Sequence, residues 1–225
     1  MGQELLQYPY SFEERRPTLI NRVFFLPPHY FGELGVLSWE SPKLFGNHHP
    51  VHIEYCSGNG EWIIDRALRY PQWNWVAVEK KFKRVRKIYA KREKRQLKNL
   101  AIVAGDAIAL TKHCLALNSV AAIYINFPDP WPKKKHAKHR LIQEEFVDNL
   151  SQVVLPAGTF TLVTDHSDYW EQIRVILEKV AIWKAVSVPA RFEEEYGSSY
   201  FDRLWRSKGL PIRFLAYQKK VSARC

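Results

Sequence analysis

Short apolar runs alternate with segments of helical periodicity from residue 51 onward. Apolar runs of this length predict buried strands, and apolar residues three and four apart predict helices. Strands alternating with helices predict βαβ units, and hence an α/β, doubly wound fold with a mostly parallel central sheet and helices on both faces. Strands are expected at 51–56, 75–79, 100–104, 121–127, 159–164 and 212–217, with helices at 61–70, 82–97, 139–150 and 168–180 and a short one ending at 117.

Residues 1–50 are rich in proline and aromatic residues and show no sustained periodicity. We expect this segment to be an N-terminal lead-in, packed on or flanking the core. Residues 51–225 are expected to form a single domain, because they show neither an internal repeat nor a low-complexity linker.

Acidic residues stand on or just beyond five successive predicted strands. The carboxyl ends of the strands in an open α/β sheet lie along one edge, where ligands bind. The sequence therefore predicts a shared cleft that contains Glu54, Glu79, Asp106, Asp129 and Asp165.

The segment 125–136 is the most informative part of the chain. An apolar run ends in Phe127-Pro128-Asp129-Pro130-Trp131-Pro132, followed by a burst of positive charge. Proline fixes its own φ and holds its predecessor extended, so Asp129 and Trp131 are expected on a stiff, non-helical ledge. A carboxylate, an indole and cations together suit a base attached to a phosphate backbone.

The first predicted strand runs into Ser57-Gly58-Asn59-Gly60. A glycine turn between a strand and a helix lets a ligand approach backbone N–H groups. The dinucleotide pattern GxGxxG is incomplete, because Ile63 fills its last position. Glu79 is placed to accept hydrogen bonds from ribose hydroxyls and Asp106 to reach an adenine amino group, an arrangement that fits a nucleoside without phosphates.

The formal net charge of +11 predicts a polyanionic partner, either nucleic acid or an anionic membrane surface. No apolar stretch approaches the roughly 20 residues that span a bilayer, and the N-terminus lacks the pattern of a secretory signal. The three cysteines have no CxxC spacing, which indicates a reduced, cytoplasmic compartment. We expect no membrane association and no metal cofactor.

Two motifs carry a family resemblance. The pattern Glu-x-x-x-Gly-x-Gly, with the later Glu and Asp, resembles class I S-adenosylmethionine-dependent methyltransferases. The ledge and its Lys-Lys-Lys-His tail closely resemble the signature of the bacterial tRNA (guanine-N7-)-methyltransferases. The resemblance spans about residues 50–220. It implies S-adenosylmethionine as cofactor, tRNA as partner and position 46 of the variable loop as target. We expect a monomer, with a dimer left open.

The resemblance also assigns roles residue by residue. It makes Asp129 the catalytic acid, close to both cofactor and guanine. It places the cofactor on Glu54, Gly58, Gly60, Glu79, Asp106 and Asp129. It places the substrate on Lys133, Asp165, Ser199, Tyr200, Phe201 and Asp202.

Three departures from the family pattern stand out. Cys56 takes the place of the usual first glycine. The C-terminal motif has Ser199 for threonine and Asp202 for glutamate. Leu204 replaces the arginine that usually follows, with Arg203 and Arg206 as displaced candidates.

The chemistry requires no proton to leave N7, so positioning for in-line transfer is expected to provide much of the rate. Asp129 is expected either to accept hydrogen bonds from the guanine N1/N2 edge or to stabilise the growing positive charge. Trp131 is either a stacking partner for the base or a core indole. The cations of 80–98 are either a solvated helix face or an RNA contact, and those of 133–140 favour RNA contact.

Two other functions are weighed against this one. An exocyclic-amino nucleic-acid methyltransferase would carry adjacent prolines, which Asn126-Phe127-Pro128-Asp129 lacks. A non-catalytic RNA-binding protein on the same fold is suggested only by Cys56, and the intact acids and glycines argue against it. A metal site at His136 and His139 lacks an acid or cysteine to complete the ligand set.

Overall fold

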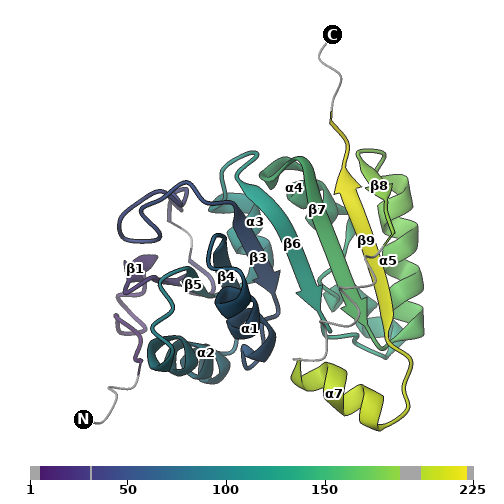
Figure 1. Cartoon of the computed structure of the whole chain (residues 1–225), viewed down its shortest axis with the longest axis horizontal. Helices are drawn as coiled ribbons and strands as arrows, with labels where there is room; N and C mark the ends of the chain where they lie inside the picture. The colour runs from purple at the N-terminus through teal and green to yellow at the C-terminus, as the bar shows by residue number, and fades with distance from the viewer. Residues whose placement is uncertain (1–5, 31, 188–198, 222–225) are drawn as a thin grey trace. The chain divides into compact units, whose positions relative to one another are not determined.

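Three fully buried parallel strands form the centre of the first part of the chain in the computed structural model, which describes residues 6–30, 32–187 and 199–221. Their Val-, Ile- and Leu-rich runs are typical of parallel strands covered on both faces. A short hairpin extends the sheet, since β2 pairs parallel with β5 and β1 pairs antiparallel with β2. The order is β1 (Thr18–Ile20), β2 (Val23–Phe25), β5 (Leu100–Ala104), β4 (Asn74–Glu79) and β3 (Val51–Tyr55) (Figure 1).

Helices cover both faces of these strands. His52 and Trp75 are register partners, and the Trp75 ring meets Trp62 of α1 at 6.0 Å. Tyr55 projects from the opposite face, because side chains alternate along a strand, and its hydroxyl lies 2.6 Å from Oγ1 of Thr111 in α3. The helices are α1 (Glu61–Arg69), α2 (Phe82–Lys94) and α3 (Ala107–His113), of which α2 packs beside α1.

The chain forms a second compact unit from Leu117 onward. Here β6 and β7 pair in parallel, while β9 pairs antiparallel with both β7 and β8 (Figure 1). Phe146, Val147 and Leu150 form the buried stripe of α4, and α4 packs beside α5. The elements are β6 (Val120–Asn126), η1 (Lys134–His139), α4 (Glu144–Val153), β7 (Val154–Thr164), α5 (Ser167–Lys179), β8 (Trp183–Ala185), α7 (Tyr200–Ser207) and β9 (Arg213–Lys219).

The predicted α/β alternation and the mostly parallel pairing are confirmed. The helix expected at 139–150 begins only at Glu144, because residues 134–139 form a 3₁₀ turn after the prolines. The strand expected from 159 begins at Val154. Local periodicity did not predict the hairpin at 18–25, β8 or α7. These elements are short, and pairing or packing with distant segments stabilises them more than local periodicity does.

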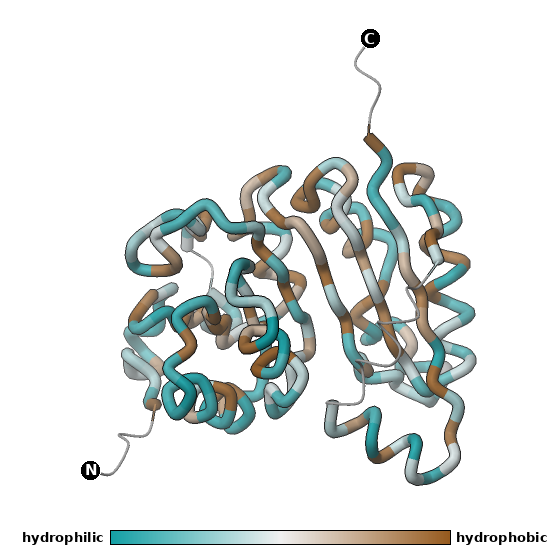
Figure 2. The backbone as a smooth tube through the Cα atoms, in the orientation of Figure 1, coloured by the Kyte–Doolittle hydropathy of each residue, from teal (hydrophilic) through white to brown (hydrophobic). Residues whose placement is uncertain are grey.

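Hydropathy follows the same architecture. The segment of α2 is coloured hydrophilic over most of its length (Figure 2). Val85 and Ile88 are among the residues of α2 that are buried. Among the described helices, none combines the length and apolar character that crossing a membrane requires.

Candidate active site

The glycine turn after β3 is strongly left-handed. Cys56, Gly58 and Gly60 have φ of 59°, 57° and 79°. A Cβ on Gly60 would lie 2.8 Å from Cγ1 of Ile88, so packing as well as backbone conformation demands glycine there. A Cβ on Gly58 would meet only a backbone oxygen at 3.9 Å. The space over Gly58 is therefore open, as close approach of a ligand requires.

Glu79 ties this turn to the end of β4. Its Oε2 accepts from the Gly58 N–H at 2.9 Å, and its Oε1 accepts from the Lys81 N–H at 2.7 Å. Arg84 lies 3.8 Å from the same carboxylate, and only 6% of Glu79 is exposed. A carboxylate has about four lone-pair sites, so both oxygens keep capacity to accept a hydroxyl.

Glu54 is buried in β3, and its backbone oxygen accepts from the Ser57 hydroxyl at 2.9 Å. This bond closes the start of the glycine turn. The structure thus brings Glu54, Gly58, Gly60 and Glu79 together around one strand end. Their contact with a cofactor stays a prediction.

Asp106 has a local role that the sequence analysis did not foresee. It is the N-cap of α3, and its Oδ1 accepts from the N–H groups of Ile108 and Ala109 at 2.9 and 3.1 Å. Its Oδ2 lies 3.3 Å from Nζ of Lys80. Capping fixes the direction of this carboxylate and leaves Oδ2 directed away from the helix.

Gly105, which sequence reasoning missed, is required by packing. A Cβ there would lie 2.6 Å from Cβ of Leu26, at the point where the chain leaves β5. The only available signal was a glycine directly after an apolar run.

The proline ledge follows β6, as predicted, but the extended geometry expected of the residues before its prolines is wrong at Phe127 and Trp131. Phe127 and Trp131 have φ of 48° and 42°, a left-handed conformation that is uncommon outside glycine. Pro128 is buried, whereas Asp129 is exposed. Trp131 is 36% exposed, so it is not the core indole that was the alternative reading. The ledge therefore presents a carboxylate and an indole to solvent.

Arg140 holds the ledge in place and was not singled out from the sequence for this role. Its Nε donates to the Pro130 carbonyl at 2.7 Å, and its Nη1 donates to Oε1 of Gln172 in α5. The guanidinium lies 4.9 Å from the centre of the Tyr169 ring, and the residue is 7% exposed. The planar Arg140 guanidinium thus links the ledge to α5.

Two imidazoles adjoin the exposed indole. The ring of Trp131 lies 5.8 Å from that of His136 and 5.3 Å from that of His139. In the part of the chain that the structure describes, no group of three or more His, Cys, Asp or Glu side chains is placed to hold a metal ion.

The predicted substrate residues lie in the second unit. Lys133 is exposed at the N-cap of η1, and the Asp165 backbone oxygen accepts from Arg213 at 3.5 Å. Phe201 in α7 meets the ring of Phe127 at 6.2 Å, so the C-terminal motif lies beside the start of the ledge. Tyr200 is 48% exposed.

Asp202 is fully buried, and the Nε of Arg206 contacts both of its carboxylate oxygens, at 3.1 and 3.0 Å. Its direct contact with substrate stays a prediction, as does the choice between Arg203 and Arg206 as the displaced arginine. Ser199, 7% exposed, is the N-cap of α7 and makes no side-chain capping bond.

Comparison with known proteins decides the family. Residues 48–213 match a family model described as a putative methyltransferase. Proteins called tRNA (guanine-N(7)-)-methyltransferase in Chlamydia abortus and Chlamydia trachomatis are 41% and 40% identical over 224 residues. Each alignment covers 98% of this chain and 99% of the relative. The chain belongs to the tRNA (guanine-N7-)-methyltransferase family.

Solved structures support the fold of this tRNA (guanine-N7-)-methyltransferase family member. The 16S rRNA methyltransferase KamB aligns with a TM-score of 0.62 at 16% identity, over 92% of this chain and 100% of KamB. A SAM-dependent methyltransferase from Aquifex aeolicus aligns with a TM-score of 0.53 at 14% identity, over 77% and 85% of the two chains. The α/β, Rossmann-like class I methyltransferase fold is confirmed.

The turn geometry explains one departure from the family pattern. Cys56 adopts the left-handed conformation that glycine adopts without steric cost, which is why glycine is usual at this position. Cys56 is partly exposed.

Proposed function

We propose that this chain transfers a methyl group from S-adenosylmethionine to N7 of a guanine in the variable loop of tRNA, at position 46, giving 7-methylguanosine. Membership of the family over the full chain is the observation that carries this proposal. The net charge of +11 suits an RNA substrate. The enzyme is proposed to act in the cytoplasm as a monomer.

The residues around β3 and β4 fit the nucleoside part of this cofactor. Gly58 leaves open space, and the carboxylates of Glu54 and Glu79 offer hydrogen-bond acceptors. We assign the ribose hydroxyls to Glu79 and the adenine amino group to Oδ2 of Asp106, with Gly60 keeping the turn tight. When bound, S-adenosylmethionine supplies an electrophilic methyl group on a sulfonium.

Asp129 is assigned as the catalytic acid. Its exposed carboxylate can accept hydrogen bonds from the N1–H and N2–H groups of guanine. Its negative charge stabilises the positive charge that the purine gains on N7 alkylation. Because the ledge is fixed through Pro130 and Arg140, this carboxylate is held in place before substrate binds. Trp131, exposed beside it, offers a stacking face.

Further substrate contacts are assigned to two regions. Lys133 follows the ledge and is exposed, which suits a phosphate contact. Asp165 follows β7. Of the C-terminal motif, Tyr200 has the largest exposed surface among the side chains, Phe201 packs on Phe127, and Ser199 and Asp202 shape the helix start, Asp202 through its pair with Arg206.

Methyl transfer from labelled S-adenosylmethionine to unmodified tRNA, followed by nucleoside analysis, tests the proposal. We expect label in 7-methylguanosine, with the rate lowered roughly 100-fold or more in Asp129→Ala. Asp148→Asn, at an exposed acid of α4, is the matched control and is expected to behave as wild type. In Asp129→Asn, a fall mainly in kcat supports charge stabilisation, whereas weaker binding with little loss of turnover contradicts it.

The same experiment distinguishes the proposed reaction from the two alternative functions. Label in another nucleoside, such as an N-methylated adenosine, would overturn the guanine assignment while keeping the enzyme class. Tight tRNA binding without any transfer would favour a non-catalytic RNA-binding protein.

A further inference from the structure

The turn between β1 and β2 has an unusual sequence for its conformation. Ile20 and Val23 are register partners, so Asn21 and Arg22 are the two central residues of a tight hairpin. Their φ values of 50° and 56° are those of a type I′ turn, whose preferred sequence is Asn-Gly. Arginine at the second position is sterically unfavourable, and a residue kept in such a conformation suggests a functional hypothesis.

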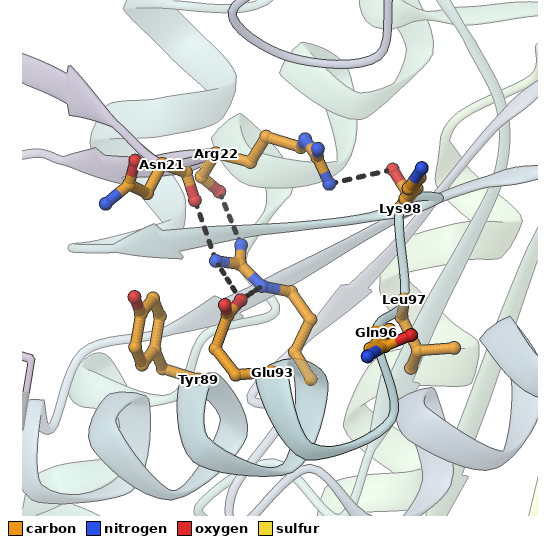
Figure 3. A pocket seen from close by; sticks show the side chains of 8 residues that line it. Asn21, Arg22, Tyr89, Glu93, Gln96, Leu97 and Lys98 are labelled. Carbon is orange, nitrogen blue, oxygen red and sulfur yellow. Dashed lines mark hydrogen bonds and ion pairs between the residues drawn. The ribbon is translucent and has the colours of Figure 1, made fainter. Parts of the chain in front are cut away.

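A buried arginine from α2 keeps the turn in this conformation. The Arg92 guanidinium donates to the backbone oxygens of Asn21 and Arg22 at 2.7 and 3.2 Å, and the Arg22 oxygen also accepts from the Ile102 N–H at 2.9 Å (Figure 3). Glu93 contacts the Arg92 guanidinium at 3.0 Å. Burial lowers the pKa of Arg92, and the charge of Glu93 opposes this effect.

The held turn borders a hollow of about 440 Å³. Glu93 is the acid in its lining, and its carboxylate is engaged with Arg92. Arg22 reaches across to donate to the Lys98 backbone oxygen at 3.3 Å, which leaves further guanidinium N–H groups available. The lining residues are Asn21, Arg22, Tyr89, Arg92, Glu93, Gln96, Leu97 and Lys98 (Figure 3).

Stabilisation of the α2 dipole does not account for all the cations in and around the hollow. Lys91, Arg92 and Lys94 occupy the last turn of α2, where positive charge stabilises the helix dipole. Arg22 and Lys98 lie outside the helix, so the dipole does not explain them. Gln96, which also lines the hollow, is left-handed as well, with a φ of 51°.

We propose that this basic hollow, with Arg22 and Lys98 as its two binding cations, holds a phosphodiester group of the tRNA substrate. The inference rests on the proposed function in taking tRNA as the partner, and it names a contact apart from the residues assigned to methyl transfer. A guanidinium fork and a lysine ammonium on one hollow match the donors that phosphate oxygens prefer. The hollow carries no sequence readout, since phosphate contacts position the RNA without specifying bases.

Arg22→Gly is the decisive variant, because it restores the preferred Asn-Gly turn while removing the cation. We expect a melting temperature equal to or above that of wild type, together with tRNA affinity lowered roughly 5- to 10-fold at 0.1 M salt. A merely structural role for Arg22 would leave tRNA affinity unchanged. Lys98→Gln is expected to lower affinity by a similar factor, and Arg22→Lys to retain most of it.

The double variant Arg22→Gly/Lys98→Gln is expected to reduce the slope of log K against log salt by about 2, one for each lost cation. Lys43→Gln/Lys184→Gln removes the same charge from exposed positions elsewhere and is the matched control. Equal affinity in the double variant and the wild type would overturn the proposal. So would an equal loss in the control, or weaker heparin binding with unchanged tRNA binding.

Affinity is measured with unmodified tRNA and without cofactor, so the result does not depend on methyl transfer. If wild-type protein forms no 7-methylguanosine but the double variant binds tRNA more weakly than the control, the proposed reaction fails and the phosphate site stands. If 7-methylguanosine forms and the double variant binds normally, only the phosphate site fails.

Discussion

Several left-handed residues other than glycine lie at the places where this chain is expected to meet its ligands. Cys56 lies in the turn assigned to the cofactor, Phe127 and Trp131 in the ledge, and Arg22 at the basic hollow. Each such residue costs on the order of 1–2 kcal/mol relative to ordinary backbone. The structure offsets this cost with specific contacts, such as the Phe127 N–H donating to the Val163 oxygen at 2.8 Å. Backbone conformation at single residues thus shapes all three regions.

A buried histidine makes the fold sensitive to acid. His52 stacks on Trp73 with a centroid distance of 4.3 Å, and Trp73 stacks on Tyr70 at 4.7 Å. Burial lowers the pKa of His52 from 6.5 to about 4. The unfolded chain therefore binds more protons between these values, so the stability contribution is complete above pH 6.5 and is lost as pH falls towards 4.

This loss is about 3 kcal/mol in full, from a shift of about 2.5 pKa units at 1.36 kcal/mol each. Denaturant unfolding between pH 4 and 8 measures it by comparing wild type with His52→Phe, which keeps an aromatic ring on Trp73 but does not titrate. We expect the stability difference between the two proteins to change across this window in favour of the variant. Parallel pH profiles would contradict the assignment.

At the scale of elements, η1 and α5 determine the position of the ledge through Arg140. Arg140→Ala removes the donor to the Pro130 carbonyl, leaving a partly buried acceptor without its bond and the ledge free to shift. A misplacement of about 1 Å at a reacting group can cost roughly 100-fold in rate, so we expect kcat to fall by about that factor. Steady-state kinetics measure kcat, and calorimetric titration with S-adenosylhomocysteine measures cofactor affinity separately.

Affinity for S-adenosylhomocysteine is expected to remain within about twofold. Of the residues assigned to the cofactor, only Asp129 lies on the ledge, and Glu79 and Asp106 are held by bonds within the first unit. Gln172→Met is the matched control, since it removes a partner of Arg140 but keeps the bond to Pro130. Its kcat should fall far less than that of Arg140→Ala. Unchanged turnover in Arg140→Ala would show that the ledge does not depend on this bond.

Elements also show where local sequence signals fail. The helix expected at 139–150 starts at Glu144 because the chain leaves the prolines through η1, which ends at His139, and an extended Arg140. The hairpin at 18–25 was missed because its two strands have three residues each and depend on pairing with β5. In contrast, the bounds of β3, β4 and β5 were predicted within a residue or so, since a continuous apolar run marks both ends of a fully buried strand.

At the scale of the whole molecule, charge is the dominant property. A net charge of +11 attracts a polyanion at long range, and the attraction is screened by salt. We expect log K for tRNA to fall linearly with log salt, with a slope of magnitude roughly 3 or more, since about four neutralised phosphates would give that value. Filter binding or fluorescence anisotropy between 50 and 300 mM salt (roughly the range where screening changes most) measures the slope. A flat dependence would refute phosphate neutralisation as the main source of affinity.

The sequence by itself determined the type and order of the main elements and the identity of the candidate residues. Periodicity is a local property, and the Gly58–Gly60 turn depends on the φ freedom of its own glycines. The sequence also located the Pro-Asp-Pro-Trp-Pro ledge, but not the left-handed backbone of Phe127 and Trp131. Family membership follows from the same local patterns, repeated over the whole chain in its relatives.

Only the tertiary structure decided what each polar group contacts. Asp106 caps α3, Glu79 holds the glycine turn, Asp202 pairs with Arg206, and Arg140 holds the ledge. Arg92 reaches backbone oxygens 70 and 71 residues away. Hydrogen bonds depend on the positions of both partners in space, and long flexible side chains such as arginine can reach many partners, so sequence patterns alone do not select among them.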